Sequence, residues 1–120
     1  MNIKGKTTTI NLDELISFSR GDKKIIQKYL TQFSKLIPGR IESLNEQLQT
    51  QDRKKLRQLL HQMSPQLQFF GIKDLVQPIR RLEHEYQTMP YGELYDLVEK
   101  ILVKLNLALI DIDLILKENF

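Results

Sequence analysis

Cysteine and tryptophan are absent from this 120-residue sequence, and histidine occurs only twice. The lack of cysteine excludes disulfide bonds, thiolate zinc sites and thiol nucleophiles, and two histidines are too few for most histidine-based metal cages. We therefore expect no metal and no other cofactor. A chain without cysteine has no need of an oxidising compartment, and we expect it in the cytoplasm.

Long apolar runs are also missing. The longest stretch without Lys, Arg, Asp or Glu extends from Gln58 to Ile72, and glutamine and serine residues interrupt it. It falls short of the ~20 apolar residues of a membrane-spanning helix. The first ten residues, MNIKGKTTTI, lack the apolar core of a signal peptide. We expect no association with a membrane.

The excess of one charge sign is small. Eighteen Lys and Arg residues stand against fifteen Asp and Glu residues, a net charge of +3, and no aromatic platform accompanies a basic cluster. Nucleic acid is therefore not the expected partner. The length allows one compact domain, so we expect a single domain over residues 1–120, with residues 1–10 as an N-terminal extension.

What the sequence does contain is helical periodicity. Apolar residues recur three or four positions apart, and no alternation typical of a β-strand extends beyond the segment KTTTI at residues 6–10. We expect an all-α protein with helices over about 12–19, 22–49, 53–70, 72–87 and 91–117. Four long amphipathic helices joined by short loops predict an antiparallel four-helix bundle, with the short first helix across one end.

Particular residues mark the ends of these helices. Asn11 and Asp52 are the expected N-caps, and Gly71 is the expected left-handed terminator of the third helix. The apolar stripe of the second helix stays in register across Pro38, which favours one long helix, with two shorter helices as the alternative. Pro78 is a candidate bend in the fourth helix.

The third helix carries a histidine on its outer side. At 100° per residue, His61 points roughly 150° away from the centre of the apolar stripe. The stripe consists of Leu56, Leu59, Leu60, Met63, Leu67 and Phe70. We expect an exposed His61, and a solvated residue without a role is the alternative to a functional one.

The outward sector around His61 is basic and polar. Lys54 and Arg57 precede it, and Ser64, Pro65 and Gln68 follow it. Cations and hydrogen-bonding groups suit a phosphoryl group or a carboxylate-rich partner, whereas an ordinary solvated face is the alternative. The proline cannot bond the carbonyl four residues back, and an interior helical proline costs ~3 kcal/mol, which suggests a local purpose.

A carboxylate on the fourth helix is a candidate partner for His61. Glu83 points only about 50° from the centre of its apolar stripe, so it needs a hydrogen-bond donor. An antiparallel hairpin about Gly71 brings Glu83 level with His61, and a bond between them would fix the tautomer and orientation of the ring. Pairing of Glu83 with Arg80 or Lys73 is the alternative.

With these features the sequence resembles a histidine phosphotransfer (HPt) domain over nearly its whole length. That family has the motif His-x-x-Lys-Gly-Ser-x-x-x-x-Gly, and residues 61–71 here read HQMSPQLQFFG. The histidine and the final glycine match, whereas Ser64 and Pro65 replace the lysine and the glycine. The upstream segment LISFSRGDKKIIQKYLTQF and the downstream pair Leu82-Glu83 are also similar to the family.

The resemblance implies a phosphocarrier rather than a turnover enzyme. His61 would accept a phosphoryl group from a phospho-aspartate on a receiver domain, of a hybrid histidine kinase or a response regulator, and pass it to another receiver. Arg57, and more remotely Lys54, are the candidates to supply the charge of the missing lysine, and Ser64 and Gln68 can only hydrogen-bond. Glu83 stands where the family often places a residue that orients the histidine.

Apolar residues at the rim of the site are the expected docking contacts for a receiver. The candidates are Leu12, Leu15, Ile16, Pro65 and Phe69. At least one residue of the short first helix should be exposed, and burial in the core is the alternative for that helix and for Phe69. The alternative function is a non-phosphorylated HPt-like adaptor that binds a signalling partner, and the changes at Ser64 and Pro65 favour it. A turnover enzyme has little support, because the sequence offers no nucleophile, base and orienting triad.

The last helix carries a second apolar stripe, opposite its core stripe. Its members are Val103, Leu107, Ile110 and Leu114. A helix with two apolar faces must cover both. We expect a homodimer through this stripe, and cover by the N-terminal segment with Ile3 and Ile10, or by another protein, is the alternative.

Overall fold

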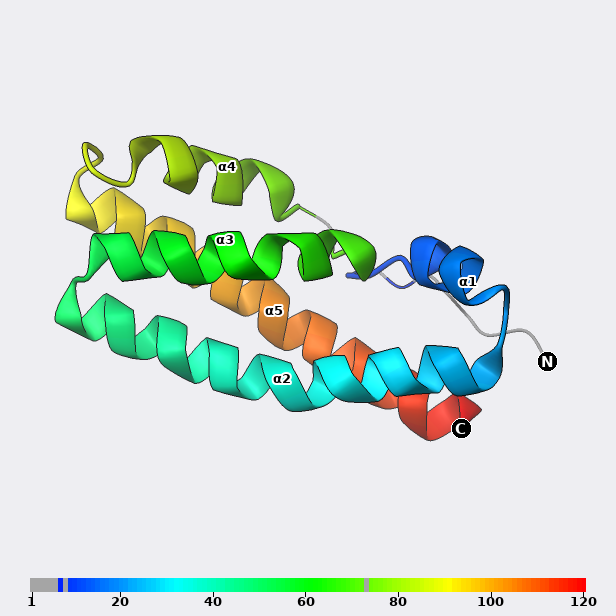
Figure 1. Ribbon diagram of the computed structural model, residues 1–120. Helices are drawn as coiled ribbons and strands as arrows, with labels where there is room; N and C mark the ends of the chain where they lie inside the picture. Colours follow the sequence, from blue (N-terminus) through cyan, green and yellow to red (C-terminus); the bar gives the residue numbers. More distant parts are fainter. Residues whose placement is uncertain (1–6, 8, 73) are drawn as a thin grey trace.

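The chain folds into helices that pack side by side along one direction. The computed structural model describes residues 7, 9–72 and 74–120. The helices are α1 (Asp13–Ser19), α2 (Lys23–Thr50), α3 (Arg53–Phe69), α4 (Val76–Glu85) and α5 (Tyr91–Asn119). Figure 1 shows α2 to α5 as the bundle, with α1 at the end where α2 begins and α3 ends. The expectation of an all-α antiparallel four-helix bundle is confirmed.

Short polar side chains begin the helices. Asp52 accepts a hydrogen bond from the backbone N–H of Lys55, as its sequence position predicted. Asp22 accepts a hydrogen bond from the backbone N–H of Lys24 at the start of α2. The first helix begins one residue later than expected, at Asp13, although the Asn11 side chain still accepts a bond from the Asp13 N–H at 3.0 Å.

Pro38 and Pro78 occupy different positions in their helices. Pro38 lies inside α2, which continues through it as one helix, so the alternative of two shorter helices is wrong. Pro78 does not interrupt a helix either, because α4 begins only at Val76, later than the expected residue 72. Asp74, with φ of 65°, has a left-handed conformation that keeps the residues before α4 out of the helix. Pro78 therefore falls in the first turn, where a backbone N–H has no partner within the helix.

The order of the helices around the core places α3 opposite α5. The helix α2 packs against α3 and α5, and α4 packs against the same two. Leucine and isoleucine from all four helices fill the space between them. The fully buried members include Leu30, Ile37, Leu44, Leu56, Leu60, Leu82, Leu94, Ile101 and Leu105. The outer faces of α3 and α5 thus lie on different sides of the molecule.

Part of the N-terminal extension belongs to the core. Ile10 is fully buried, and the Asn11 N–H donates to the Gly71 carbonyl at 3.0 Å. Leu12 and Leu15 are also fully buried, so their interpretation as docking residues is wrong. The Asn11–Gly71 hydrogen bond holds the chain against the bundle just before Leu12. The side chains of Leu12 and Leu15 therefore pack over the end of the core. Ile3 lies outside the described residues.

The α3–α4 hairpin is held at both ends. At one end is the bond between Asn11 and Gly71. At the other, Nη1 of Arg53 donates to the backbone carbonyls of Tyr86 and Met89, at 3.0 and 2.5 Å. These contacts restrict sliding of α4 along α3. Within the part of the chain that the structure describes, no helix has the length and hydropathy to cross a membrane.

We predict that Gly71→Ala destabilises the protein and that Gly39→Ala does not. Gly71 has φ of 59°, and a Cβ there would come within 2.9 Å of the Asn11 carbonyl carbon. The loss should be at least about 2 kcal/mol in the free energy of unfolding, measured by urea denaturation. Gly39 is helical with open space around it, so alanine should stabilise by up to about 1 kcal/mol. Equal effects of the two changes would contradict this role of Gly71.

Candidate functional site

His61 lies near the middle of α3, on the face turned away from the core. Its side chain is 65% exposed, as its angle from the apolar stripe predicted. The neighbouring stripe residues Leu60 and Met63 are fully buried, so the backbone that carries the imidazole is held firmly. The site therefore combines a rigid support with an accessible ring.

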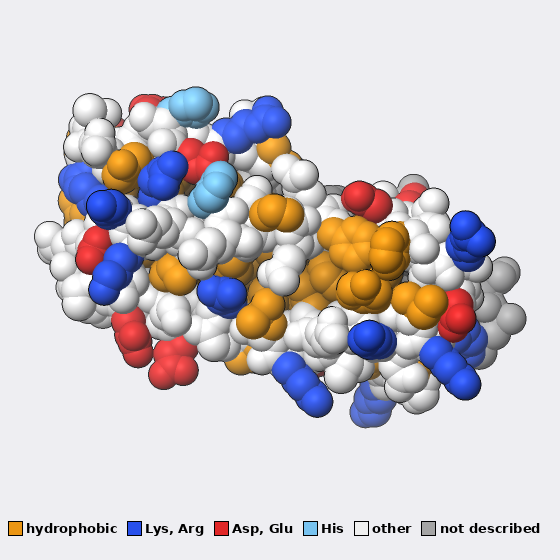
Figure 2. All heavy atoms as spheres, in the orientation of Figure 1, with side chains coloured by type: hydrophobic (Ala, Val, Ile, Leu, Met, Phe, Trp, Pro, Cys, Tyr) orange, Lys and Arg blue, Asp and Glu red, His pale blue; other side chains and the backbone are white. Residues whose placement is uncertain are grey.

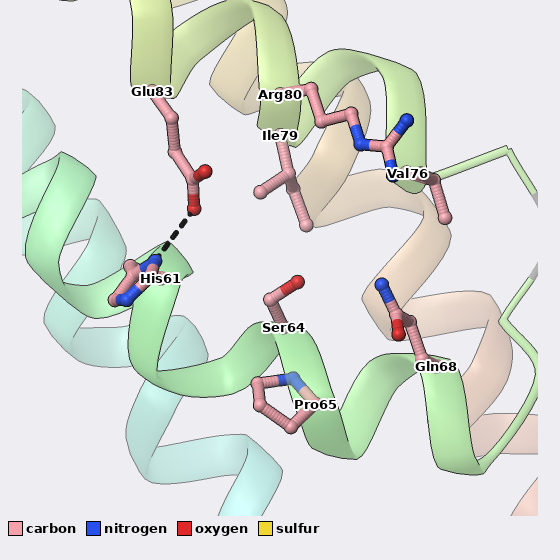
Figure 3. A pocket seen from close by; sticks show the side chains of 8 residues that line it. All are labelled: His61, Ser64, Pro65, Gln68, Val76, Ile79, Arg80 and Glu83. Carbon is pink, nitrogen blue, oxygen red and sulfur yellow. Dashed lines mark hydrogen bonds and ion pairs between the residues drawn. The ribbon is translucent and has the colours of Figure 1, made fainter.

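The expected bond between His61 and Glu83 is present. Nδ1 of the imidazole lies 2.9 Å from Oε1 of Glu83, which comes from α4 (Figure 3). A carboxylate only accepts hydrogen bonds, so Nδ1 must carry the proton. In the neutral ring, Nε2 then has a free lone pair. Figure 3 shows Nε2 on the side of the ring away from Glu83.

A hollow opens beside this pair, between α3 and α4. Its volume is about 300 Å³. It is lined by His61, Ser64, Pro65, Gln68, Val76, Ile79, Arg80 and Glu83 (Figure 3). The structure thus brings together five of the predicted site residues, which are His61, Ser64, Pro65, Gln68 and Glu83.

The predicted cations Arg57 and Lys54 do not line this hollow. Arg57 lies one turn before His61 on α3, and its guanidinium carbon is 5.5 Å from the centroid of the Tyr86 ring. This cation–π contact holds the side chain at the surface. Lys54 is exposed and lies about one turn further from His61.

Among the described residues, Arg80 is the cation that lines the hollow, and the sequence predicted it only as an alternative partner for Glu83. The available signal was spacing, because residues three apart on a helix share a face, and Arg80 precedes Glu83 by three. Lys73, the other considered partner, lies outside the described residues.

An aromatic patch lies on the same face of the molecule. Phe18, Tyr29 and Phe69 meet edge to face, with ring centroids 5.6 to 5.8 Å apart. Figure 2 shows hydrophobic side chains gathered where α1, α2 and the end of α3 meet, on the face that also displays the histidines. Phe18 is 61% exposed. Of the expected docking residues, Phe69 belongs to this patch, and Ile16 is half-buried.

The sequence did not predict Phe18 as a docking residue, because helical spacing alone groups it with the buried face of the first helix. It follows Leu15 by three residues, and such pairs usually share a side of the helix. In the structure Leu15 points into the core, whereas Phe18 leans over the rings of Tyr29 and Phe69. Only the position of α1 on the bundle decides this difference.

We predict that Glu83 sets the tautomer of His61. In the wild-type protein, ¹⁵N NMR of the neutral imidazole should show the proton on Nδ1, because the carboxylate accepts it. In Glu83→Ala the proton should move largely to Nε2, the tautomer usual in water. His84, which is exposed and on the same helix as Glu83, gives an internal reference in the same spectra. An unchanged tautomer in Glu83→Ala would contradict the prediction.

The comparisons with known proteins give one match. A family model described as Hpt domain matches residues 28–112. No curated protein matches, and no solved structure matches. Among the described residues, no group of three or more His, Asp or Glu side chains is placed to hold a metal ion. The family match covers more than half of the chain and contains both His61 and Glu83, and the chain therefore belongs to the Hpt domain family.

Proposed function

We propose that this protein carries phosphoryl groups on Nε2 of His61. The group would come from a phospho-aspartate on one receiver domain and pass to an aspartate on another. The family supports a phosphotransfer role in a phosphorelay. The observation that carries the assignment to this atom is the bond from Nδ1 of His61 to Glu83, which leaves the other nitrogen of an exposed ring free to attack.

The chemistry of the transfer explains why a carboxylate is useful here. The lone pair of Nε2 attacks phosphorus, the N–P bond forms, and the acyl P–O bond breaks with the aspartate carboxylate as leaving group. Nδ1 keeps its proton, so the phosphorylated ring carries a positive charge. Glu83 lies against that nitrogen and offsets the charge as it develops. Transfer to the second receiver reverses these steps.

The phosphoryl group also needs a cation, since the lysine of the family motif is replaced by Ser64. We assign this role to Arg57, one turn before His61 on the same helix. In Figure 3, Nε2 points away from the hollow and so away from Arg80. Contact with Tyr86 limits the conformations of the Arg57 guanidinium, which reduces the entropy lost when it binds an anion. Ser64 and Gln68 line the hollow together with Arg80, so in this geometry they lie on the other side of the ring from the phosphoryl group.

A receiver domain would dock over His61 and onto the aromatic patch. Exposed aromatic side chains on a monomer mark interaction surfaces, and signalling contacts are often small. Phe18 offers the largest exposed apolar side chain of the patch. Pro65 is exposed between His61 and Phe69, and it extends the apolar rim toward the site.

A non-phosphorylated adaptor is the second candidate function. The replacement of the family's lysine and glycine by Ser64 and Pro65 is the observation that favours it, because a carrier without that lysine has lost one charge next to the phosphoryl group. An adaptor would use the same docking surface but would not need the imidazole.

The decisive test is transfer of labelled phosphate from a receiver domain loaded with acetyl phosphate. Wild type should gain a label that is acid-labile and base-stable, whereas His61→Gln should gain none. His84→Gln is the matched control and should label normally, because His84 is exposed but is not the histidine that Glu83 orients. Phe18→Ala should weaken receiver binding and slow labelling without abolishing it. Absence of label on wild type that still binds the receiver would support the adaptor.

The assignment of the cation has its own test. Arg57→Ala should slow transfer about tenfold, which corresponds to ~1.4 kcal/mol of transition-state stabilisation. Lys54→Ala should have a smaller effect, because the residue is a turn further away. Single-turnover rates from the loaded receiver measure both. If Arg80→Ala slows transfer more than Arg57→Ala, the phosphoryl group lies in the hollow and the assignment to Arg57 is wrong.

A further inference from the structure

The outer face of α5 exposes an apolar stripe that the proposed phosphotransfer does not use. The stripe comprises Val103, Leu107, Ile110 and Leu114, whose side chains are 55, 44, 56 and 48% exposed. On the opposite side of the same helix, Leu105, Ala108 and Ile112 are fully buried in the core. The helix is therefore apolar on two faces, and the described part of the chain covers only one.

The spacing within the stripe is that of a coiled-coil seam. Its members are separated by four, three and four residues, the a and d positions of two heptads. Packing within the bundle does not require this pattern, since the stripe does not face the bundle. A second helix of the same kind is the partner that such a seam fits best.

The stripe adjoins an apolar groove at one end. The groove has a volume of about 300 Å³ and lies between α5 and the start of α4. Leu75, Pro78, Ile101 and Val103 form its apolar wall. A leucine side chain from a second copy would enter it and lose contact with water.

Charges along the stripe favour one orientation of the second copy. Within four residues of Val103, α5 carries Glu99, Lys100 and Lys104, a net charge of +1; within four residues of Leu114 it carries Asp111, Asp113, Lys117 and Glu118, a net charge of −2. A parallel arrangement would bring ends of like net charge together, whereas an antiparallel one brings the net positive end against the net negative end, with Lys100 level with Lys117 and Glu99 level with Glu118 as the like-charge pairs. The existing bond of Lys104 to Asp74 is long, at 3.6 Å, and exposed, so it does not prevent a new contact.

We propose that two copies of this protein pair through α5, antiparallel about a two-fold axis between Leu107 and Ile110. Val103 of each copy then packs beside Leu114 of the other, at the mouth of the groove. Lys104 comes near Asp111 of the second copy, whose Oδ2 also accepts a hydrogen bond from Thr7 of its own chain. The stripe spans only two heptads, so the interface is small. We therefore expect a dissociation constant in the micromolar range.

The dimer leaves the phosphotransfer site open. The helices α3 and α5 are diagonal in the bundle (Figure 1). Because His61 and the stripe are both on outward faces of these helices, they lie on different sides. Each copy of the dimer would display its own His61 and aromatic patch. The proposal is therefore independent of the phosphotransfer function.

Sedimentation equilibrium from about 1 μM to 1 mM tests the association. The apparent mass should rise with concentration from 14.2 kDa toward twice that value. Leu107→Lys should weaken dimerisation at least tenfold, because it places like charges at the two-fold axis. Tyr95→Lys is the matched control, an exposed apolar residue on α5 outside the stripe, and should dimerise normally. Leu107→Lys should still accept phosphate at the wild-type rate, and His61→Gln should still dimerise.

Cross-linking tests the orientation, since the chain has no cysteine of its own. A mixture of the Val103→Cys and Leu114→Cys variants should form a disulfide-linked dimer, whereas each variant alone should not. Linkage of each variant to itself would overturn the antiparallel arrangement.

Two outcomes would reject the homodimer. A protein that stays monomeric and does not bind 8-anilinonaphthalene-1-sulfonate would have the stripe covered by another part of its own chain. A monomeric protein that binds this dye through the stripe, with binding lost in Leu107→Lys, would keep the stripe for a different protein.

Discussion

The contact between Gly71 and Asn11 is the constraint on which the site depends. Gly71 adopts a left-handed conformation and lies against the Asn11 backbone so closely that a side chain cannot fit. This contact sets the point at which α3 ends and the chain returns toward α4. His61 lies ten residues before that point and Glu83 twelve after it, so a shift of α4 along α3 by one turn would separate the pair by about 5 Å.

The pair itself has little value for stability. His61 is 65% exposed and Glu83 26% exposed, and ion pairs in such positions contribute little because water and salt screen them. Its value lies in orientation. A free imidazole exchanges its proton between two nitrogens, whereas this one presents a defined nitrogen to solvent. The residues that stabilise the fold are instead the buried leucines and isoleucines behind His61, and the two sets of residues can vary separately.

The bundle separates two surfaces that have different chemistry. The α3 side combines an exposed imidazole, nearby arginines and an aromatic patch, which suits a charged group and a transient partner. The α5 side is aliphatic and heptad-spaced, which suits a helix of the same kind. Since α3 and α5 do not adjoin around the core, binding at one surface does not block the other. A four-helix bundle provides this separation simply by the order of its helices.

Helical periodicity is a local property, and the sequence alone determined what depends on it: the all-α class, the outward direction of His61, the continuity of α2 through Pro38 and the cap at Asp52. The sequence also predicted that Glu83 lies opposite His61, because residues at similar distances from the turn of an antiparallel hairpin lie side by side. The tertiary structure decided the rest. Burial of Leu12 and exposure of Phe18 depend on how α1 docks, and the entry of Arg80 into the hollow depends on the distance between α3 and α4. Spacing along a chain specifies which side of a helix a residue occupies, whereas the neighbour it meets there is set by packing between helices.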